Sequence, residues 1–257
     1  MTRVINTQGV DNLRDFGGYP TACGRGLKTG RLYRSANHQH ATDEDLEALA
    51  ALNLAVIVDL RRTDERERFP SRRHPAFAGQ VIHNDLGDAD RGWEHMLRGQ
   101  DPTVELFRSK SADWYRRAAF EPRHIDLFTR YFAALTDAGG PVLIHCAAGK
   151  DRTGLLAALT HHLAGVRRDD MMEDYLLTNR MDLHSRRGKV IAGLIAEYTG
   201  ITPTEDALRA AMGVEASDLE LALATIEERS GSLDAYLEQV LGVDAAKRAA
   251  FETRYLG

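Results

Sequence analysis

Residues 141–160 constrain the fold of this chain more than any other stretch. The apolar run Pro-Val-Leu-Ile-His occupies 141–145, and an alanine- and leucine-rich run occupies 155–160. Between them lies Cys-Ala-Ala-Gly-Lys-Asp-Arg-Thr-Gly, at 146–154. A short, continuous apolar run is typical of a strand buried in a parallel sheet, and a second such run after a tight loop favours a helix. We therefore expect a buried strand, a loop and a helix in direct succession.

The start of such a helix is a natural binding site for an anion, because its first backbone N–H groups have no partner within the helix. Cys146 would lie inside this electropositive loop, where the nucleophilic thiolate is favoured. Six residues later, Arg152 would present a planar guanidinium suited to two oxygens of one phosphate. A nucleophile, a ring of amides and a bidentate cation together predict phosphoryl transfer through a phosphocysteine.

Each residue of the loop has an expected role. Thr153 would either donate its hydroxyl to the sulfur or satisfy backbone at the start of the helix. Lys150 would add positive charge at the rim or remain a solvated lysine. Gly149 would allow the tight turn. The backbone N–H groups that would hold three phosphate oxygens belong to consecutive residues: Ala147, Ala148, Gly149, Lys150, Asp151 and Arg152.

The oxygen that leaves phosphorus needs a proton, which a positioned carboxyl group can supply. Asp151 lies within the loop and is our first candidate. Asp59 ends an apolar run and would share the same edge of the sheet, where it would act directly or orient Lys150 or Arg152. Asp85 and Asp88 follow a further short strand. The sequence leaves these candidates open.

The rest of the chain predicts one α/β domain, residues 1–257, with a mostly parallel sheet flanked by helices. Further strands are expected at 31–35, 54–60 and 80–83, and helices from Thr42 and across 124–135. Beyond Asp169 the pattern is helical, so residues 185–257 would form a C-terminal helical layer. Residues 87–122 are too long for a plain connection and are rich in aromatic residues. They would form a helical lid over the active site or an ordinary helical insertion on the core.

Two polar stretches have alternative interpretations. The loop at 146–152 is called the catalytic loop below. The segment Asn-Leu-Arg-Asp-Phe-Gly-Gly at 12–18 is either a turn whose side chains bind its own backbone or a support for this catalytic loop. Residues 61–73 are rich in arginine and acid. They would form a solvated helix or loop with weak ion pairs, or a basic rim that attracts a polyphosphorylated head group.

Composition excludes several classes of protein. A net charge of −5 argues against nucleic acid as the main partner, and two cysteines in 257 residues argue against a disulfide framework. We expect no membrane span, no signal peptide and a cytoplasmic location.

The adjacent pair His161-His162 points in two directions on a helix, so we expect no metal there. We also expect no cofactor. Cys23, in a glycine turn, is expected to be a bystander rather than a redox partner of Cys146.

The motif His-Cys-x-Ala-Gly-Lys-Asp-Arg-Thr-Gly resembles the cysteine-based protein tyrosine phosphatases, specifically the bacterial tyrosine and phosphoinositide phosphatases of the mycobacterial PtpB type. The resemblance extends to 12–18, to Val-Asp-Leu-Arg at 58–61, to Asp-Tyr-Leu-Leu-Thr-Asn at 174–179 and to 231–237. It implies a phosphatase fold, no metal, and activity on phosphotyrosine and sometimes on phosphoserine, phosphothreonine or phosphoinositides. It also implies a helical lid over the active site. Lys150 would favour the binding of substrates that carry extra phosphate groups.

Two other functions compete with the phosphatase interpretation. A rhodanese-like sulfurtransferase also uses a loop cysteine, but the Gly-Lys-Asp interior of this loop and the Thr-Gly after the arginine argue against it. A phosphate-binding module without turnover would usually lack the cysteine or the arginine, and this chain has both. The substrate expected is therefore a phosphorylated protein or a phosphoinositide.

Overall fold

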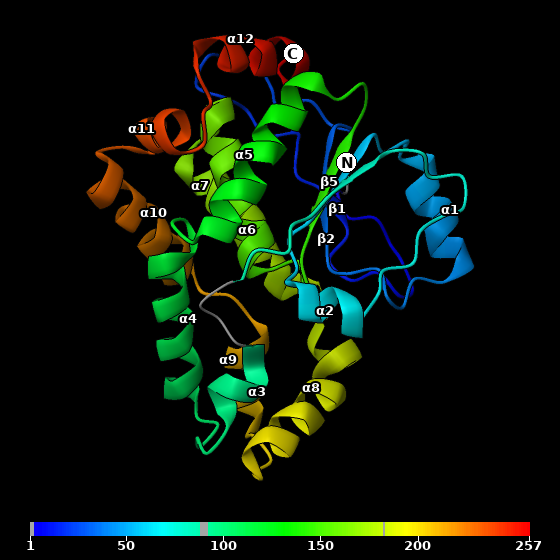
Figure 1. Cartoon of the computed structure of the whole chain (residues 1–257), viewed down its shortest axis with the longest axis vertical. Coiled ribbons are helices and arrows are strands. Elements are labelled where there is room, and N and C mark those ends of the chain that lie inside the picture. The colour runs from blue at the N-terminus through cyan, green and yellow to red at the C-terminus, as the bar shows by residue number, and fades with distance from the viewer. Residues whose placement is uncertain (1–2, 88–91, 182) are drawn as a thin grey trace.

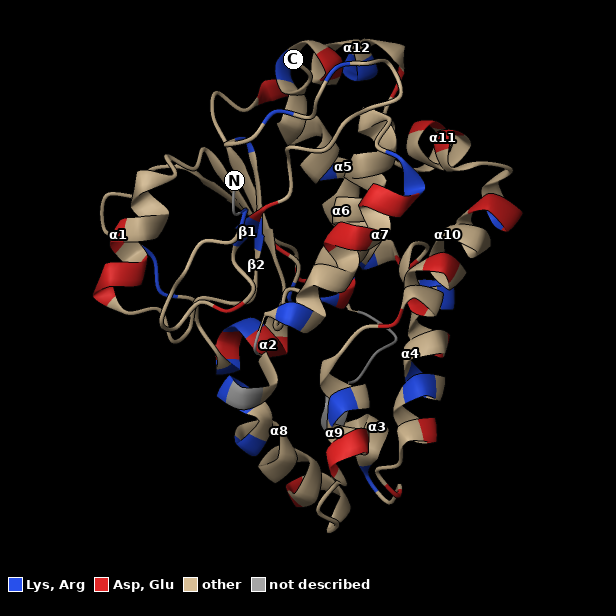
Figure 2. Ribbon diagram, turned by 180° about the vertical axis from the view of Figure 1, so that it is seen from behind, with Lys and Arg blue, Asp and Glu red and all other residues tan. Residues whose placement is uncertain are grey.

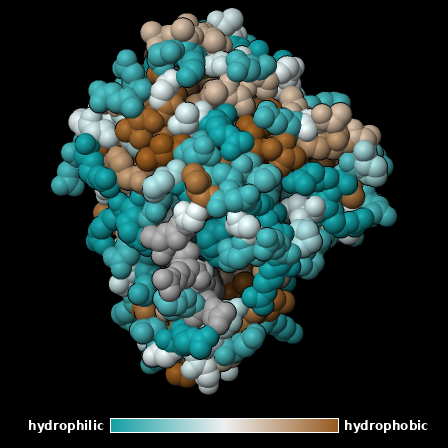
Figure 3. Space-filling view, viewed as in Figure 1, coloured by the Kyte–Doolittle hydropathy of each residue, from teal (hydrophilic) through white to brown (hydrophobic). Residues whose placement is uncertain are grey.

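The computed structural model describes residues 3–87, 92–181 and 183–257, without the side chains of Trp93, Glu94 and Ser185. A five-stranded sheet lies among helices in the upper part of Figure 1, and a second group of helices lies below it. Hydrophilic side chains cover most of the face shown in Figure 3, and hydrophobic ones form separate groups on it. Within the described ranges, no helix has both the length and the apolar character that a membrane span requires.

The sheet has the spatial order β1-β2-β5-β3-β4. Its strands are β1 (Arg14–Asp15), β2 (Leu32–Ser35), β3 (Val56–Asp59), β4 (Gln80–Ile82) and β5 (Val142–His145). Only the β1–β2 pair is antiparallel among these strands. Asp59 and Ser35 both pair with His145, so β2, β5 and β3 end at one level. The sheet thus confirms the mostly parallel α/β fold expected from the sequence, and Asp59 and Cys146 share one edge.

Side chains alternate between the two faces of the sheet because the pleat has a period of two. Val58 and Ile144 belong to the large core beneath the helices, whereas Ile57 and Leu143 belong to a smaller core beneath α1 (Asp43–Ala51). Both faces are therefore covered, which explains the continuous apolar runs in the sequence. Thr42 caps α1 as predicted, since its side chain accepts from the Asp45 N–H.

The large core is enclosed by helices from the middle and the end of the chain. Its residues come mainly from α5 and α6, which lie side by side in Figure 1, and from the C-terminal elements. Within the expected C-terminal helical layer, residues 233–240 form one short helical turn followed by a π-helix. The elements are α5 (Pro122–Asp137), α6 (Asp151–Ala164), α7 (Arg168–Leu176), the 3₁₀-helix η1 (Leu177–Arg180), α10 (Ala216–Ser230), α11 (Leu233–Ala235), the π-helix η2 (Tyr236–Val240) and α12 (Ala245–Tyr255).

A helical lobe lies below the sheet in Figure 1. It consists of α3 (Gly92–Leu97), α4 (Val104–Ala118), α8 (Leu183–Thr199) and α9 (Glu205–Met212). Its own apolar cluster contains Leu97, Phe107, Ile195, Ala207, Leu208 and Ala211. The lobe thus combines the 87–122 segment with α8 and α9 from the C-terminal helical region.

Helix α4 joins the lobe to the main domain. Its N-terminal half contributes Phe107 to the lobe cluster, and its C-terminal half contributes Tyr115 and Ala118 to the large core. Trp114 packs edge-on against His124 of α5, with ring centroids 5.9 Å apart. The second half of the expected lid therefore packs on the core, and movement of the segment as a lid stays a prediction.

Candidate active site

The strand, loop and helix of the central motif form as predicted. β5 ends at His145, Cys146 is buried, and α6 begins at Asp151. Gly149 has a φ of +68°, and a Cβ added there would lie 2.4 Å from the carbonyl oxygen of Ser35. Only glycine fits this position, because the left-handed region and the close approach of another backbone both exclude a side chain.

Side chains outside the loop bind three of its carbonyl oxygens. Asn37 Nδ2 donates to the Ala147 carbonyl at 2.8 Å, and Asn12 Nδ2 donates to those of Ala148 and Gly149 at 3.2 and 2.8 Å. The C=O and N–H of a planar trans peptide point in opposite directions. Carbonyls drawn outward therefore leave the amides that follow them facing the inside of the loop, where an anion would bind.

The loop support extends to a buried cluster of ions. Arg34 Nη2 also donates to the Gly149 carbonyl, at 2.9 Å, and its Nη1 donates to Asp174 at 2.6 Å. Asp174 also accepts from Arg14 Nε at 3.0 Å. Burial would raise the pKa of Asp174, but Arg14 and Arg34 hold it well below its usual range. The 12–18 segment therefore supports the catalytic loop, in agreement with the second of its two interpretations.

Arg152 is held by Glu65, a residue of α2 (Thr63–Arg68) that the sequence analysis did not single out. Glu65 accepts from Nη1 at 2.6 Å and from Nη2 at 2.8 Å, and the Leu60 carbonyl accepts from Nη1 at 3.2 Å. These contacts use three of the five guanidinium donors. The remaining two, Nε–H and one Nη2–H, lie on one edge of the group and could hold two phosphate oxygens.

Asp59 forms a buried ion pair with Arg61. Both of its oxygens accept from Arg61, at 2.9 Å from Nε and 2.7 Å from Nη2. Its Oδ2 also lies 3.6 Å from His145 Nε2. Burial would raise the pKa of Asp59, but His145 and Arg61 hold it well below its usual range. A carboxyl group that resists protonation in this way is poorly suited to donate a proton.

Lys150 is bound by the helical lobe rather than left as a solvated lysine. Its Nζ donates to the carbonyl of Ala211 at 2.9 Å and to that of Gly213 at 3.0 Å. These carbonyls belong to the C-terminal end of α9, where a cation is favourable. Lys150 thus ties the catalytic loop to the helical lobe.

Asp151, the first residue of α6, contacts helix α4. Its Oδ1 accepts from the Tyr115 hydroxyl of α4 at 3.0 Å, and its Oδ2 lies 3.7 Å from Lys150 Nζ. Tyr115 in turn lies 2.6 Å from the Tyr175 hydroxyl of α7. A pair of tyrosines from two helices therefore fixes the acidic side chain of the loop.

The other candidates are placed differently. Asp85 is exposed and pairs with Arg66, and Asp88 lies outside the described residues. Thr153 Oγ1 is buried and makes no hydrogen bond to the described part of the chain.

Most arginines of 61–73 have an acidic partner, and Figure 2 shows both charges together on α2, so the ion-paired interpretation of this stretch holds.

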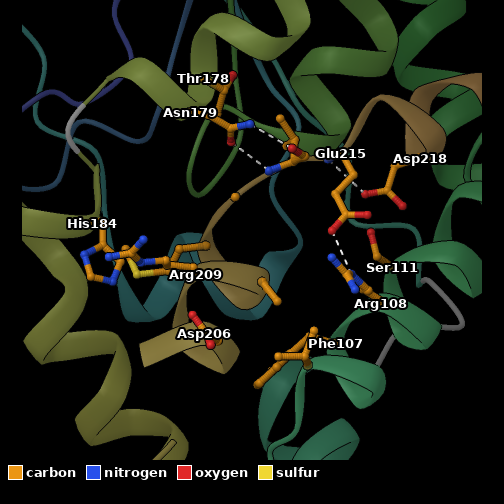
Figure 4. Close-up of a pocket in the computed structure, with 15 residues that line it drawn as sticks. Phe107, Arg108, Ser111, Thr178, Asn179, His184, Asp206, Arg209, Glu215 and Asp218 are labelled. Atoms are coloured by element: carbon orange, nitrogen blue, oxygen red, sulfur yellow. Dashed lines mark hydrogen bonds and ion pairs between the residues drawn. The ribbon is translucent and has the colours of Figure 1, made fainter. Parts of the chain in front are cut away.

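A pocket of about 720 Å³ lies between α4, α8, α9 and α10. In Figure 4, Thr178 and Asn179 lie at one end of it, Phe107 lies at the other, and His184 and Arg108 face each other across it. Cys146 and Arg152 are not among its lining residues. Gly213 lines the pocket and also accepts from Lys150, so the pocket adjoins the loop through α9. Among the described residues, no group of histidine, cysteine and acidic side chains could hold a metal ion.

The sequence predicts the loop itself better than the distant residues that bind its side chains. Glu65 gave no signal beyond its place among other charged residues, and Tyr115 was one aromatic residue among many in 87–122. Both act across long separations in the sequence, 87 residues to Arg152 and 36 residues to Asp151. The motif at 174–179 was noted, but nothing in it indicated that Asp174 pairs with two arginines.

Two relatives and a family model support the resemblance drawn from the loop. The chain is 32% identical over 246 residues to a protein of Cupriavidus necator named as a tyrosine-protein phosphatase, covering 93% of this chain and 84% of that one. It is 31% identical over 262 residues to the triple specificity protein phosphatase PtpB of Mycobacterium tuberculosis, covering 89% and 91%. The crystal structure of Pseudomonas aeruginosa TpbA aligns with a TM-score of 0.32 and 19% identity, covering 80% and 97%. Since residues 5–257 also match the family model described as the tyrosine phosphatase family, the chain belongs to the tyrosine phosphatase family.

Proposed function

We propose that this protein hydrolyses phosphotyrosine in proteins through a phosphocysteine formed on Cys146. The observation that carries the proposal is the placement of a buried cysteine in a loop whose carbonyls are bound from outside. Two donors of Arg152 have no partner among the described residues. In this role the amides from Ala147 to Arg152 hold the three phosphate oxygens. Arg152 binds two of them more tightly as they gain charge in the transition state.

The reaction has two steps. In the first, the Cys146 thiolate attacks phosphorus, the bond to the leaving oxygen breaks, and Asp151 donates its proton to that oxygen. In the second, Asp151 takes a proton from water, the water oxygen attacks phosphorus, and the thiolate leaves as phosphate is released. Thr153, whose hydroxyl has no hydrogen-bond partner in the described part of the chain, can donate to the departing sulfur. Asp151 is preferred to Asp59 because Arg61 occupies both oxygens of Asp59.

The substrate range is a separate part of the proposal. Two features limit the binding of a second phosphate group on the substrate. Lys150 donates hydrogen bonds to carbonyls at the end of α9, and most arginines of 61–73 form ion pairs with acidic residues. Phosphotyrosine is therefore the main substrate, and phosphoserine, phosphothreonine and phosphoinositides are secondary ones. The relative from M. tuberculosis is named for triple specificity, so a panel of these phosphoesters is the informative comparison.

The test uses the full chain with p-nitrophenyl phosphate and phosphotyrosine peptides. Hydrolysis should be lost in Cys146→Ser while tungstate binding survives, and acid quenching of the wild-type reaction should trap phosphate on Cys146. A Cys146→Ser variant as active as wild type would overturn the mechanism. A phosphate-binding module without turnover would bind tungstate but hydrolyse none of the panel.

A further inference from the structure

Tyr115 makes the closest described contact between the helical lobe and the candidate acid of the catalytic loop. Its ring is buried at the end of α4, where it packs edge-on against Trp114 and Tyr175. Its hydroxyl lies 3.0 Å from Asp151 Oδ1 and 2.6 Å from the Tyr175 hydroxyl. A buried hydroxyl that bonds both a carboxyl group and a second hydroxyl is held in one position.

The direction of the hydrogen bonds follows from the proton count. An ionised carboxylate can only accept, and each tyrosine has one proton to donate. Tyr115 therefore donates to Asp151, and Tyr175 donates to Tyr115. Burial, and next the negative charge of Asp151, raise the pKa of both tyrosines well above the ordinary value. Both hydroxyls are therefore protonated at neutral pH.

The hydrogen bond from Tyr115 distinguishes the two carboxyl oxygens of Asp151, and other charged groups lie nearby. Lys150 Nζ lies 3.7 Å from Oδ2, and Arg152 follows directly in the chain. On α10, Asp218 has its pKa raised by burial and, to a smaller degree, by Asp151. Because Tyr115 occupies Oδ1, the proton that Asp151 carries as an acid resides on Oδ2.

We infer that Tyr115 is a positioning residue for proton transfer by Asp151, with Tyr175 as its support. The inference rests on the proposed function and adds to it a role for the 87–122 segment. Tyr115 fixes the carboxyl so that Oδ2 delivers its proton to the leaving oxygen as the P–O bond breaks and the P–S bond forms. In the second step, the same fixed oxygen takes the proton from the attacking water.

Substrates with different leaving groups test this inference. The value of kcat/KM reports the first step, in which a poor leaving group needs the proton and a good one does not. Tyr115→Phe should therefore lose about 10- to 100-fold on phenyl phosphate, the range expected from losing a hydrogen bond to a charged group. It should lose much less on p-nitrophenyl phosphate, and the basic limb of its pH profile should shift. Tyr175→Phe should show a smaller effect of the same kind.

Tyr131→Phe is the matched control, because Tyr131 is equally buried but bonds Thr160 within the core. It removes a buried tyrosine hydroxyl without touching Asp151. Equal losses on both substrates in Tyr115→Phe, or no loss on either, would overturn the positioning role. Either result leaves the proposed function standing if Cys146→Ser remains inactive, so the two failures are distinguishable.

Discussion

Glu65 Oε2 and Oε1 accept hydrogen bonds from Nη1 and Nη2 of Arg152 at 2.6 and 2.8 Å. Although burial opposes the charged form, Arg152 and then Arg62 lower the pKa of Glu65 to about 2. The pair therefore stays ionised at neutral pH. It fixes the guanidinium so that the Nε–Nη2 edge has no partner among the described residues, and a phosphate could bind along this edge.

Removing the Glu65 carboxylate should impair catalysis. Glu65→Ala is expected to lower kcat/KM for p-nitrophenyl phosphate by about 100-fold, because a misplaced catalytic group costs roughly that much. Tungstate should also bind more weakly. Glu67→Ala is the control, since Glu67 is exposed on the same helix. If Glu65 instead blocked Arg152 from phosphate, the alanine variant would be faster than wild type.

Gly149 should not tolerate a methyl group. In Gly149→Ala the new Cβ would meet the Ser35 carbonyl at a φ of +68°, so the loop would have to move. We expect activity to fall by at least about 100-fold, the usual effect of losing one amide that stabilises an oxyanion. Gly139→Ala offers a comparison, because a Cβ at Gly139 meets nothing within 4 Å. Comparable activities for these two variants would contradict the role of the loop.

Asp174 should be essential for stability. Asp174→Asn leaves Arg14 and Arg34 buried without a charged partner, which costs about 3–5 kcal/mol in similar sites. For a chain of this size the midpoint of thermal unfolding should fall by roughly 6–20 °C. Calorimetry would measure the change. A midpoint within 2 °C of wild type, about 1 kcal/mol or less, would show that the cluster contributes little.

Stability should fall as the solution becomes acidic. Asp59, Asp174 and Glu65 have folded pKa values below their unfolded values of about 4, so the unfolded chain binds more protons in acid. Their contribution is complete above about pH 5 and is lost progressively as the pH falls from there toward the folded pKa values, which lie at about 2 or below. Burial also lowers the pKa of His145 to about 4 and that of His124 to about 3, which removes stability below about pH 6.5. Urea unfolding at pH 7, 5 and 4 should show a steady decrease, and a flat profile would contradict these shifts.

Lys150 should anchor the helical lobe. Lys150→Met keeps the length of the side chain but removes the donors to Ala211 and Gly213. Amide hydrogen exchange near the C-terminal end of α9 should become faster, because local opening costs less free energy. Lys189→Met, at an exposed position on α8, should leave that exchange unchanged. Identical exchange in both variants would mean that Lys150 does not hold the lobe.

The sequence alone determined the strand, loop and helix at 141–164 and the order of the chemical groups along them. It could do so because a buried strand, a glycine turn and a helix start depend on neighbours within a few residues. The same local logic predicted the parallel sheet and the shared edge of Asp59 and Cys146. It also identified 12–18 as a candidate support for the loop, but could not choose between a self-contained turn and that support.

Only the tertiary structure decided what each charged side chain does. Asp59 ends at the predicted edge but is bound by Arg61, and Lys150 follows the predicted loop but turns toward α9. Glu65 and Tyr115 reach the site from distant segments. Ion pairs and hydrogen bonds between long side chains form wherever packing brings them within about 3 Å, and this depends on the whole fold rather than on local spacing. The order of chemical groups in the loop is therefore encoded locally, whereas the partners of its side chains are set by contacts across the molecule.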